Sequence, residues 1–140
     1  MSDAMAAALA AEEAAIYAYG LLGVKLTSDG DLTEARACEA IHRDRRDALV
    51  LRLAALKAST APAPAGYQLP FEVTDRDSAL KLAIQVEDGV AQAWRATLPS
   101  TEGGDRSTAL SALTDAAVRA TRWRRRGNVS PVTLPWPGRP

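Results

Sequence analysis

The chain has 140 residues and a mass of 14.8 kDa, and its 17 Lys and Arg residues balance 17 Asp and Glu residues. This length predicts one compact domain spanning residues 1–140, and the zero formal net charge argues against a chain that binds polyelectrolytes as a whole. A single cysteine, Cys38, excludes an internal disulfide and a thiolate zinc cluster, and a single histidine, His42, excludes any site that needs two imidazoles from one chain.

The amino-terminal segment is alanine-rich, but it lacks the features of a targeting signal. No basic region precedes the apolar run, and Glu12 and Glu13 interrupt it. No uninterrupted apolar stretch approaches the ~20 residues that a membrane-spanning helix needs. We therefore expect a cytoplasmic protein that makes no use of a membrane.

Alanine is the most frequent residue and β-branched runs are short, which favours an all-α fold. Helical periodicity predicts a first helix over residues 4–26 and, after a turn at residues 27–31, a second over 32–58. The inward face of the second helix should carry six residues: Ala35, Cys38, His42, Leu49, Leu53 and Leu56. Two long helices with a short turn between them predict an antiparallel hairpin.

Residues 59–73 contain three prolines and should be extended, pinned by Tyr67, Leu69, Phe71 and Val73. A linker of ~16 residues at ~3.3 Å each can run the full length of a bundle and start the third helix where the second started. Thr74 is the predicted N-cap of a helix over 75–98, with Asp77 completing a capping box.

A fourth helix is predicted over residues 105–125, with five inward residues: Leu110, Leu113, Ala117, Ala120 and Trp123. The proline-rich tail, residues 127–140, should lie extended across the bundle through the alternating side chains of Val132, Leu134 and Trp136. Four helices with short first and last connections and one long crossover between helices 2 and 3 predict a ferritin-like four-helix bundle.

Bundles of this type build di-metal sites from a Glu on each of two helices and Glu-x-x-His on each of the other two. Glu12 or Glu13, the Glu39-x-x-His42 pair and Glu87 supply part of this set, and carboxylates with imidazole suit iron or manganese. The fourth helix has no histidine, so a full di-iron site lacks at least one ligand.

Glu87 lies inside the apolar stripe of the third helix, where an unpaired carboxylate would cost several kcal/mol. It therefore needs a partner, and the candidates are His42, Arg45, Arg46, Tyr17 and Tyr19. An arginine of the run at residues 43–47 can turn inward, because its planar fork binds a carboxylate through two hydrogen bonds.

Five arginines cluster around Trp123 at the end of the fourth helix: Arg119, Arg122, Arg124, Arg125 and Arg126. They can form an anion or nucleic-acid patch with aromatic stacking. We favour the simpler interpretation that they complement a helix C-terminus, because the patch is short and the chain is neutral.

Five segments together resemble an alanine-rich, ferritin-like family of unknown function from actinobacteria: AEEAAIYAYG (11–20), HRDRRDAL (42–49), AGYQLPFEV (65–73), AIQVE (83–87) and AAVRATRWR (116–124). The resemblance implies a ferritin-like fold and favours Glu12 over Glu13. It also implies a set of signature positions: Tyr17, Tyr19, His42, Arg46, Asp47, Tyr67 and Glu87. It implies no reaction, and Glu39 is not one of its signatures.

Three hypotheses follow. The first is a bundle without metal cofactors, leaning non-enzymatic, that has a buried Glu12–His42–Glu87 cluster and acts through an unidentified protein partner. The second is a reduced iron or manganese site of Glu12, Glu39, His42 and Glu87 for oxidative chemistry or storage. The third is a nucleic-acid module that uses the arginines of the fourth helix. A homodimer is also expected, because Trp94, Trp123 and Trp136 are large apolar surfaces for a small domain to cover.

Overall fold

The computed structural model describes all 140 residues and contains four α-helices and no strand, which confirms the all-α prediction. The helices are α1 (Ser2–Leu22), α2 (Asp29–Ala55), α3 (Arg76–Thr97) and α4 (Gly103–Arg126). Two short 3-10 turns, η1 (Gly23–Lys25) and η2 (Leu98–Ser100), follow α1 and α3. Each predicted helix is present, with its bounds within a few residues of the expectation.

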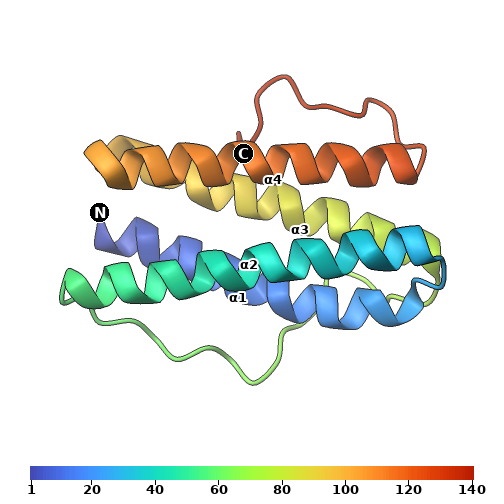
Figure 1. Cartoon of the computed structure of the whole chain (residues 1–140), viewed down its shortest axis with the longest axis horizontal. Coiled ribbons are helices and arrows are strands. Elements are labelled where there is room, and N and C mark those ends of the chain that lie inside the picture. Colours follow the sequence, from blue (N-terminus) through green and yellow to red (C-terminus); the bar gives the residue numbers. More distant parts are fainter.

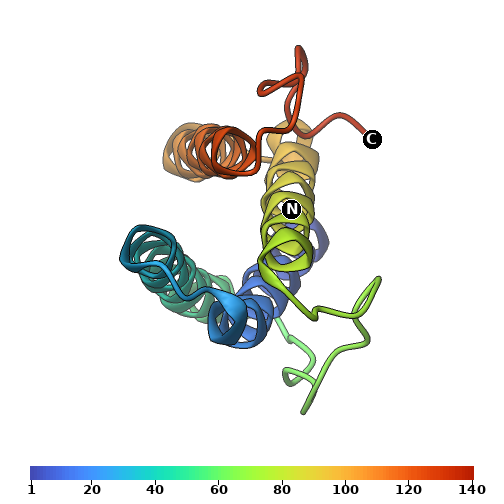
Figure 2. The ribbon, with the colours of Figure 1, turned by 90° about the vertical axis from the view of Figure 1, so that its right-hand side faces the viewer.

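α1 and α4 run in one direction along the bundle and α2 and α3 in the other (Figure 1). α3 packs against both α1 and α4, and α1 packs against α2 (Figure 2). The connection of residues 56–75 runs back along the bundle, so that α3 begins at the same end as α2 (Figure 1). This is the course that the length of the linker predicted, and its residues Tyr67, Leu69, Phe71 and Val73 are half-buried.

Capping side chains explain two helix starts. Ser28 accepts a hydrogen bond from the amide of Asp31 and starts α2 three residues earlier than predicted. At α3 the N-cap is Asp75, not Thr74, and the capping box is closed by Ser78, not Asp77. The prediction was wrong by one residue, because Thr74 and Asp75 are both favourable N-cap residues and the side chain of Asp75 is the one that accepts from Ser78.

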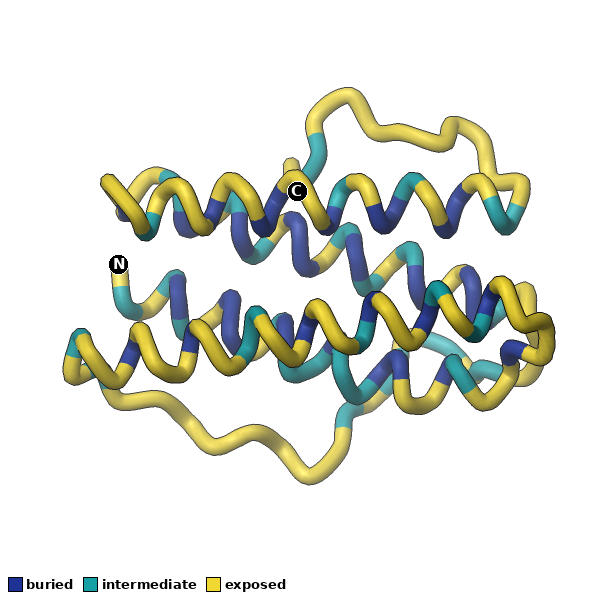
Figure 3. Tube along the Cα trace, in the orientation of Figure 1, coloured by how far each residue is buried: buried dark blue, intermediate teal, exposed yellow.

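The buried apolar residues form two clusters, one toward each end of the bundle. The closed end, where α1 and α4 end, contains Leu22, Leu80 and Trp123. The open end, where α1 and α4 begin, contains Met5, Leu49, Trp94 and six alanines: Ala8, Ala15, Ala91, Ala109, Ala112 and Ala116. Figure 3 shows the buried residues on the helix faces that point toward the bundle axis. The two clusters leave the middle of the bundle to polar side chains.

The inward face of α4 differs from the prediction. Leu110 is 54% exposed and Ala117 is half-buried, whereas Ala109, Ala112 and Ala116 are buried. The apolar pattern pointed to the leucine, but small side chains let α4 pack closely on α3 and place Arg119 inside the bundle. The predicted inward positions Leu113, Ala120 and Trp123 are buried.

The carboxyl-terminal tail does not lie flat across the bundle as predicted, and Figure 1 shows it arching away from α4. Val132 and Leu134 are each 39% exposed, and Trp136 is 62% exposed. Near its end the tail returns to α3, where Arg95 donates to the carbonyl of Pro137. A Cβ at Gly138 would come within 2.6 Å of the carbonyl oxygen of Ala91, so glycine permits this close approach.

Two expectations from the sequence, on exposed tryptophans and on membrane-length helices, differ from the structure. Trp94 and Trp123 are buried within the single chain, so only Trp136 still offers the exposed apolar surface on which the homodimer was expected. The segment Ser2–Lys25 is long and apolar enough to cross a membrane, contrary to the sequence expectation. An alanine-rich core helix has the same composition, and α1 buries one face, including the carboxylate of Glu12, against its neighbours.

Candidate functional site

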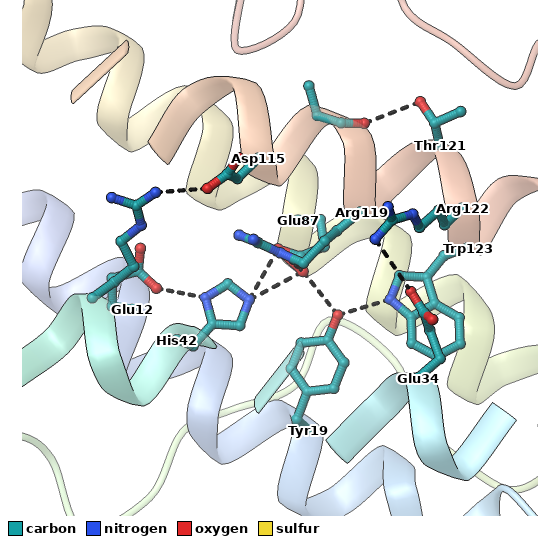
Figure 4. Close-up of polar contacts among 12 residues, drawn as sticks. Glu12, Tyr19, Glu34, His42, Glu87, Asp115, Arg119, Thr121, Arg122 and Trp123 are labelled. Carbon is teal, nitrogen blue, oxygen red and sulfur yellow. Dashed lines mark hydrogen bonds and ion pairs between the residues drawn. The ribbon is translucent and has the colours of Figure 1, made fainter. Parts of the chain in front are cut away.

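A connected network of buried polar side chains lies between the two apolar clusters, and each of the four helices contributes to it (Figure 4). Glu12 comes from α1 and is fully buried. Its Oε1 accepts a hydrogen bond from the indole Nε1 of Trp94 at 2.7 Å. Its Oε2 lies 2.5 Å from Nδ1 of His42 on α2. Both carboxylate oxygens of Glu12 are therefore paired without water.

His42 is also fully buried and bridges two carboxylates. Its Nδ1 faces Glu12, and its Nε2 lies 3.0 Å from the carboxylate of Glu87 on α3. A neutral imidazole has one nitrogen without a proton, and here that lone pair would face a carboxylate. The doubly protonated imidazolium satisfies both carboxylates, because it donates from both nitrogens. The ring of Tyr19 stacks on it with centroids 5.5 Å apart.

Glu87 is the centre of the network. In addition to His42, it accepts from Nε of Arg119 on α4, at 3.1 and 2.9 Å to its two oxygens, and from the hydroxyl of Tyr19 at 2.9 Å. The Tyr19 hydroxyl in turn accepts a hydrogen bond from Nε1 of Trp123 at 2.8 Å. The series of contacts therefore runs from Trp94 at the open end to Trp123 at the closed end.

The network balances its charge, with two carboxylates against one imidazolium and one guanidinium. Burial opposes the charged form of His42, but hydrogen bonds to Glu12 and Glu87 outweigh it and raise the pKa from 6.5 to about 9. Burial also favours neutral Glu87, yet His42 and Arg119 hold the pKa of that carboxyl below its usual value. Burial and the charge of Glu87 raise the pKa of Tyr19 well above its ordinary range, so Tyr19 remains a neutral donor.

Of Glu12 and the seven signature positions that the family resemblance implied, the structure brings four together: Glu12, Tyr19, His42 and Glu87. Tyr17 instead packs against Tyr67 of the crossover, with ring centroids 5.1 Å apart. Arg46 and Asp47 pair with each other near the surface, 2.8 Å apart. Tyr17 and Tyr67 hold the crossover against α1, and Arg46 and Asp47 lie near the surface of α2. None of these four residues takes part in the network.

Glu39 lies outside the network. It pairs with Arg43 one turn along α2, at 3.3 Å, and its side chain is partly exposed. Arg45 likewise points away from Glu87 and binds Asp115 of α4 at 2.7 Å. The Glu-x-x-His spacing therefore does not bring its two side chains to one point, because the carboxylate faces solvent and the imidazole faces the core.

The five arginines of α4 do not form a single patch. Arg119 is buried on Glu87, and Arg124 is buried against Asp88. Arg126 binds Asp31 at 3.1 Å, and Arg122 lies 3.9 Å from Glu34. Only Arg125 is exposed without a carboxylate partner. Acidic residues of α2 and α3 thus neutralise most of the charge that the sequence placed at this helix end.

Three members of the network were missed from sequence: Trp94, Trp123 and Arg119. The two tryptophans were assigned to packing, although a buried indole N–H normally finds an acceptor and these two lie on the stripes that carry Glu87 and Arg119. Arg119 was counted with the surface arginines. Its place on the fourth helix, near the position where a second Glu-x-x-His would be required, could have indicated that Arg119 enters the core.

The donor set does not fit a metal centre. No three His, Cys, Asp or Glu side chains are arranged to hold a metal ion together. Both nitrogens of His42 face carboxylates, and the guanidinium of Arg119 lies against the carboxylate that a cation would need. Cys38 is buried and protonated, because burial and the charge of Glu87 raise its thiol pKa to about 11.

The fold and the network together define a class: an all-helical four-helix bundle whose core is divided by a neutral cluster of ion pairs. A profile of the family described as "domain of unknown function (DUF4439)" matches residues 4–140, and the chain belongs to this family. The chain is also similar to a solved structure, a conserved hypothetical protein, Rv2844, from Mycobacterium tuberculosis. The two share 40% identity with a TM-score of 0.84, over 89% of this chain and 94% of that one. No curated protein matches.

Proposed function

We propose that this protein is a metal-independent, ferritin-like binding module in which the buried ion cluster takes the place of a di-metal centre. The course of the helices supports the ferritin-like part, since bundles of that class have one long crossover and build their sites from facing helices. In this chain the crossover is the connection of residues 56–75. The proposal thus explains why acids on α1 and α3 and a histidine on α2 point inward.

One observation supports metal independence. Both ring nitrogens of the only histidine, His42, face carboxylates, and Arg119 of α4 donates to the carboxylate of Glu87. Imidazolium and guanidinium supply the positive charge that metal ions would supply in such a site. A metal would have to displace both, leaving a buried guanidinium without its partner at a cost of several kcal/mol.

The cluster gives such a protein a rigid core without a cofactor. It ties α1, α2, α3 and α4 to one another through charged hydrogen bonds in a region from which water is excluded. The carboxylates of Glu12 and Glu87 and both ring nitrogens of His42 are engaged within the cluster, so they are not available to a substrate. Binding therefore belongs to the surface of the bundle rather than to its centre.

Elemental analysis tests the proposal. The protein is produced in medium supplemented with iron and manganese and purified without chelators, beside the variant His42→Ala. We expect both proteins to contain far less than one metal per chain. Near-stoichiometric iron or manganese in the wild type, lost in His42→Ala, would contradict the proposal and favour the reduced metal site.

A further inference from the structure

A cavity of about 600 Å³ lies at the open end of the bundle, between α2 and α4. Its size is within the range of small-molecule sites, roughly 300–1,000 Å³. Met5, Leu49 and Trp94 provide its apolar side chains, and Arg45, Arg52 and the first turn of α4 provide polar ones. The cavity is separate from the ion cluster, although Trp94 belongs to both.

Small side chains leave this space unfilled. The residues that α2 and α4 present to the cavity between the arginines include Ala48, Gly104 and Thr108. The corresponding region at the closed end is filled by the fully buried indole of Trp123. The two helices are bridged at the open end by the charged pairs Arg45–Asp115 and Arg52–Asp105, with no close packing of their backbones.

The arginines keep unused hydrogen-bond donors. Arg45 donates to Ser111 and Asp115 through Nη2 alone, so its Nε and Nη1 groups have no protein partner. Its side chain is only 20% exposed, so these donors are partly shielded from water. Arg52 uses Nε and Nη2 on Asp105 and leaves Nη1 free.

The first turn of α4 adds donors of the same kind. Its N-cap residue, Glu102, makes no side-chain capping bond, and the amides of Gly104 and Asp105 have no acceptor. Both residues line the cavity. The carboxylate of Asp105, by contrast, already accepts from Arg52 through both oxygens. The carboxylate of Glu102 also borders the cavity without an ion-pair partner, but this residue is exposed to solvent. The unused groups of Arg45, Arg52 and the first turn of α4 are donors, which favour an anionic acceptor.

We propose that this cavity binds a small amphipathic carboxylate, with its apolar chain against Met5, Leu49 and Trp94 and its carboxylate on Arg45 and the first turn of α4. The inference rests on the proposed function, since it names what the binding module takes. It needs no metal and no movement of the ion cluster.

Titration with three probes of equal chain length tests the charge preference: decanoate, decanol and decylamine, each below its micelle-forming concentration. Calorimetry gives the affinities. ¹⁵N NMR follows the three indole signals, each assigned with a Trp→Phe variant. We expect saturable decanoate binding at least about tenfold tighter than that of decanol, with decylamine weakest, and the largest indole shift at Trp94.

Two pairs of variants locate the site. Arg45→Gln should weaken decanoate binding about tenfold or more and bring it to the level of decanol, whereas Arg43→Gln, an exposed arginine of α2 outside the cavity, should leave it unchanged. Ala48→Phe should fill the cavity and block all three probes, whereas Ala54→Phe, an exposed alanine of the same helix, should not. Thermal unfolding of each variant without probe verifies that it is folded.

Equal affinity for the three probes would overturn the proposal, as would decanoate binding that survives Ala48→Phe or shifts only the indole of Trp136. Preference for decylamine would reverse the charge assignment and also overturn it. These outcomes are independent of metal content. A metal-free protein that ignores decanoate contradicts this inference alone, and a metal-loaded protein that binds decanoate contradicts the proposed function alone.

Discussion

At each end of the bundle an indole N–H donates into the ion cluster: Trp123 to Tyr19 at the closed end, and Trp94 to Glu12 at the open end. Their surroundings differ. Trp123 belongs to the apolar cluster of its end, where Asp31 is also buried and pairs with Arg76 and Arg126. Trp94 has a cavity on one side, bridged by ion pairs that are partly open to solvent. One end is built for packing and the other retains space for a ligand.

The ion cluster separates these two tasks. Charged hydrogen bonds between all four helices fix the middle of the bundle, so the open end can remain incompletely packed without loss of the helix arrangement.

The largest effect is expected when the cluster loses a cation. Arg119→Leu leaves Glu87 buried with one positive partner fewer, and removing one member of a buried pair costs about 3–5 kcal/mol. Chemical denaturation should show this loss in the free energy of unfolding. Arg125→Leu on the same helix is the matched control, because Arg125 is exposed and unpaired. Similar, small losses in both variants would contradict a cluster that stabilises the fold.

The two ends should differ in their response to truncation. Leu22→Ala at the closed end should cost about 3–4 kcal/mol, because the surrounding side chains are packed and cannot collapse. Leu49→Ala should cost less, about 2 kcal/mol, because this side chain borders a cavity and has fewer contacts to lose. The contrast fails if denaturation curves give equal losses, or if Leu49→Ala costs more.

The pH dependence reports on the charge of His42. Its pKa is about 9 in the folded protein against 6.5 for the ordinary group, so its contribution is fully present below pH 6.5 and is lost as the pH rises through 9. This shift corresponds to a loss on the order of 3 kcal/mol. Glu87 acts in the opposite sense, because its lowered pKa adds stability above its unfolded pKa that disappears under acid. Denaturation at a series of pH values should give an alkaline slope that His42→Gln removes.

Substitutions in the ion pairs of the two ends should have the smallest effects on the free energy of unfolding. The closed end should again be the more sensitive of the two. Asp31→Asn removes a buried acceptor shared by two arginines and should cost about 1 kcal/mol. Asp105→Asn removes a partner of a more exposed arginine and should change the denaturation midpoint little. A larger loss for Asp105→Asn would show that the bridge across the open end, and not the closed end, holds the helices together.

Sequence periodicity predicted four helices, and the length of the linker predicted the long crossover. The family resemblance favoured Glu12 over Glu13 as the acid that joins His42 and Glu87. A stripe of apolar residues interrupted by a carboxylate marks where a buried charge must be, but it does not say which cation meets it. Arg119 has four arginine neighbours within seven residues, and only the rotation of α4 decides which of them enters the core. That rotation follows from the packing of alanines against α3, whereas the leucine on which the prediction relied, Leu110, is exposed.

The protonation state of His42 tests the central claim most directly. The chain has a single histidine, so a ¹⁵N-histidine-labelled sample gives one unambiguous pair of ring nitrogen signals. We expect both nitrogens to carry a proton at neutral pH and one proton to be lost only near pH 9. A ring with one unprotonated nitrogen at pH 7, whether neutral or bound to a metal ion, would contradict the ion cluster on which the proposed function rests.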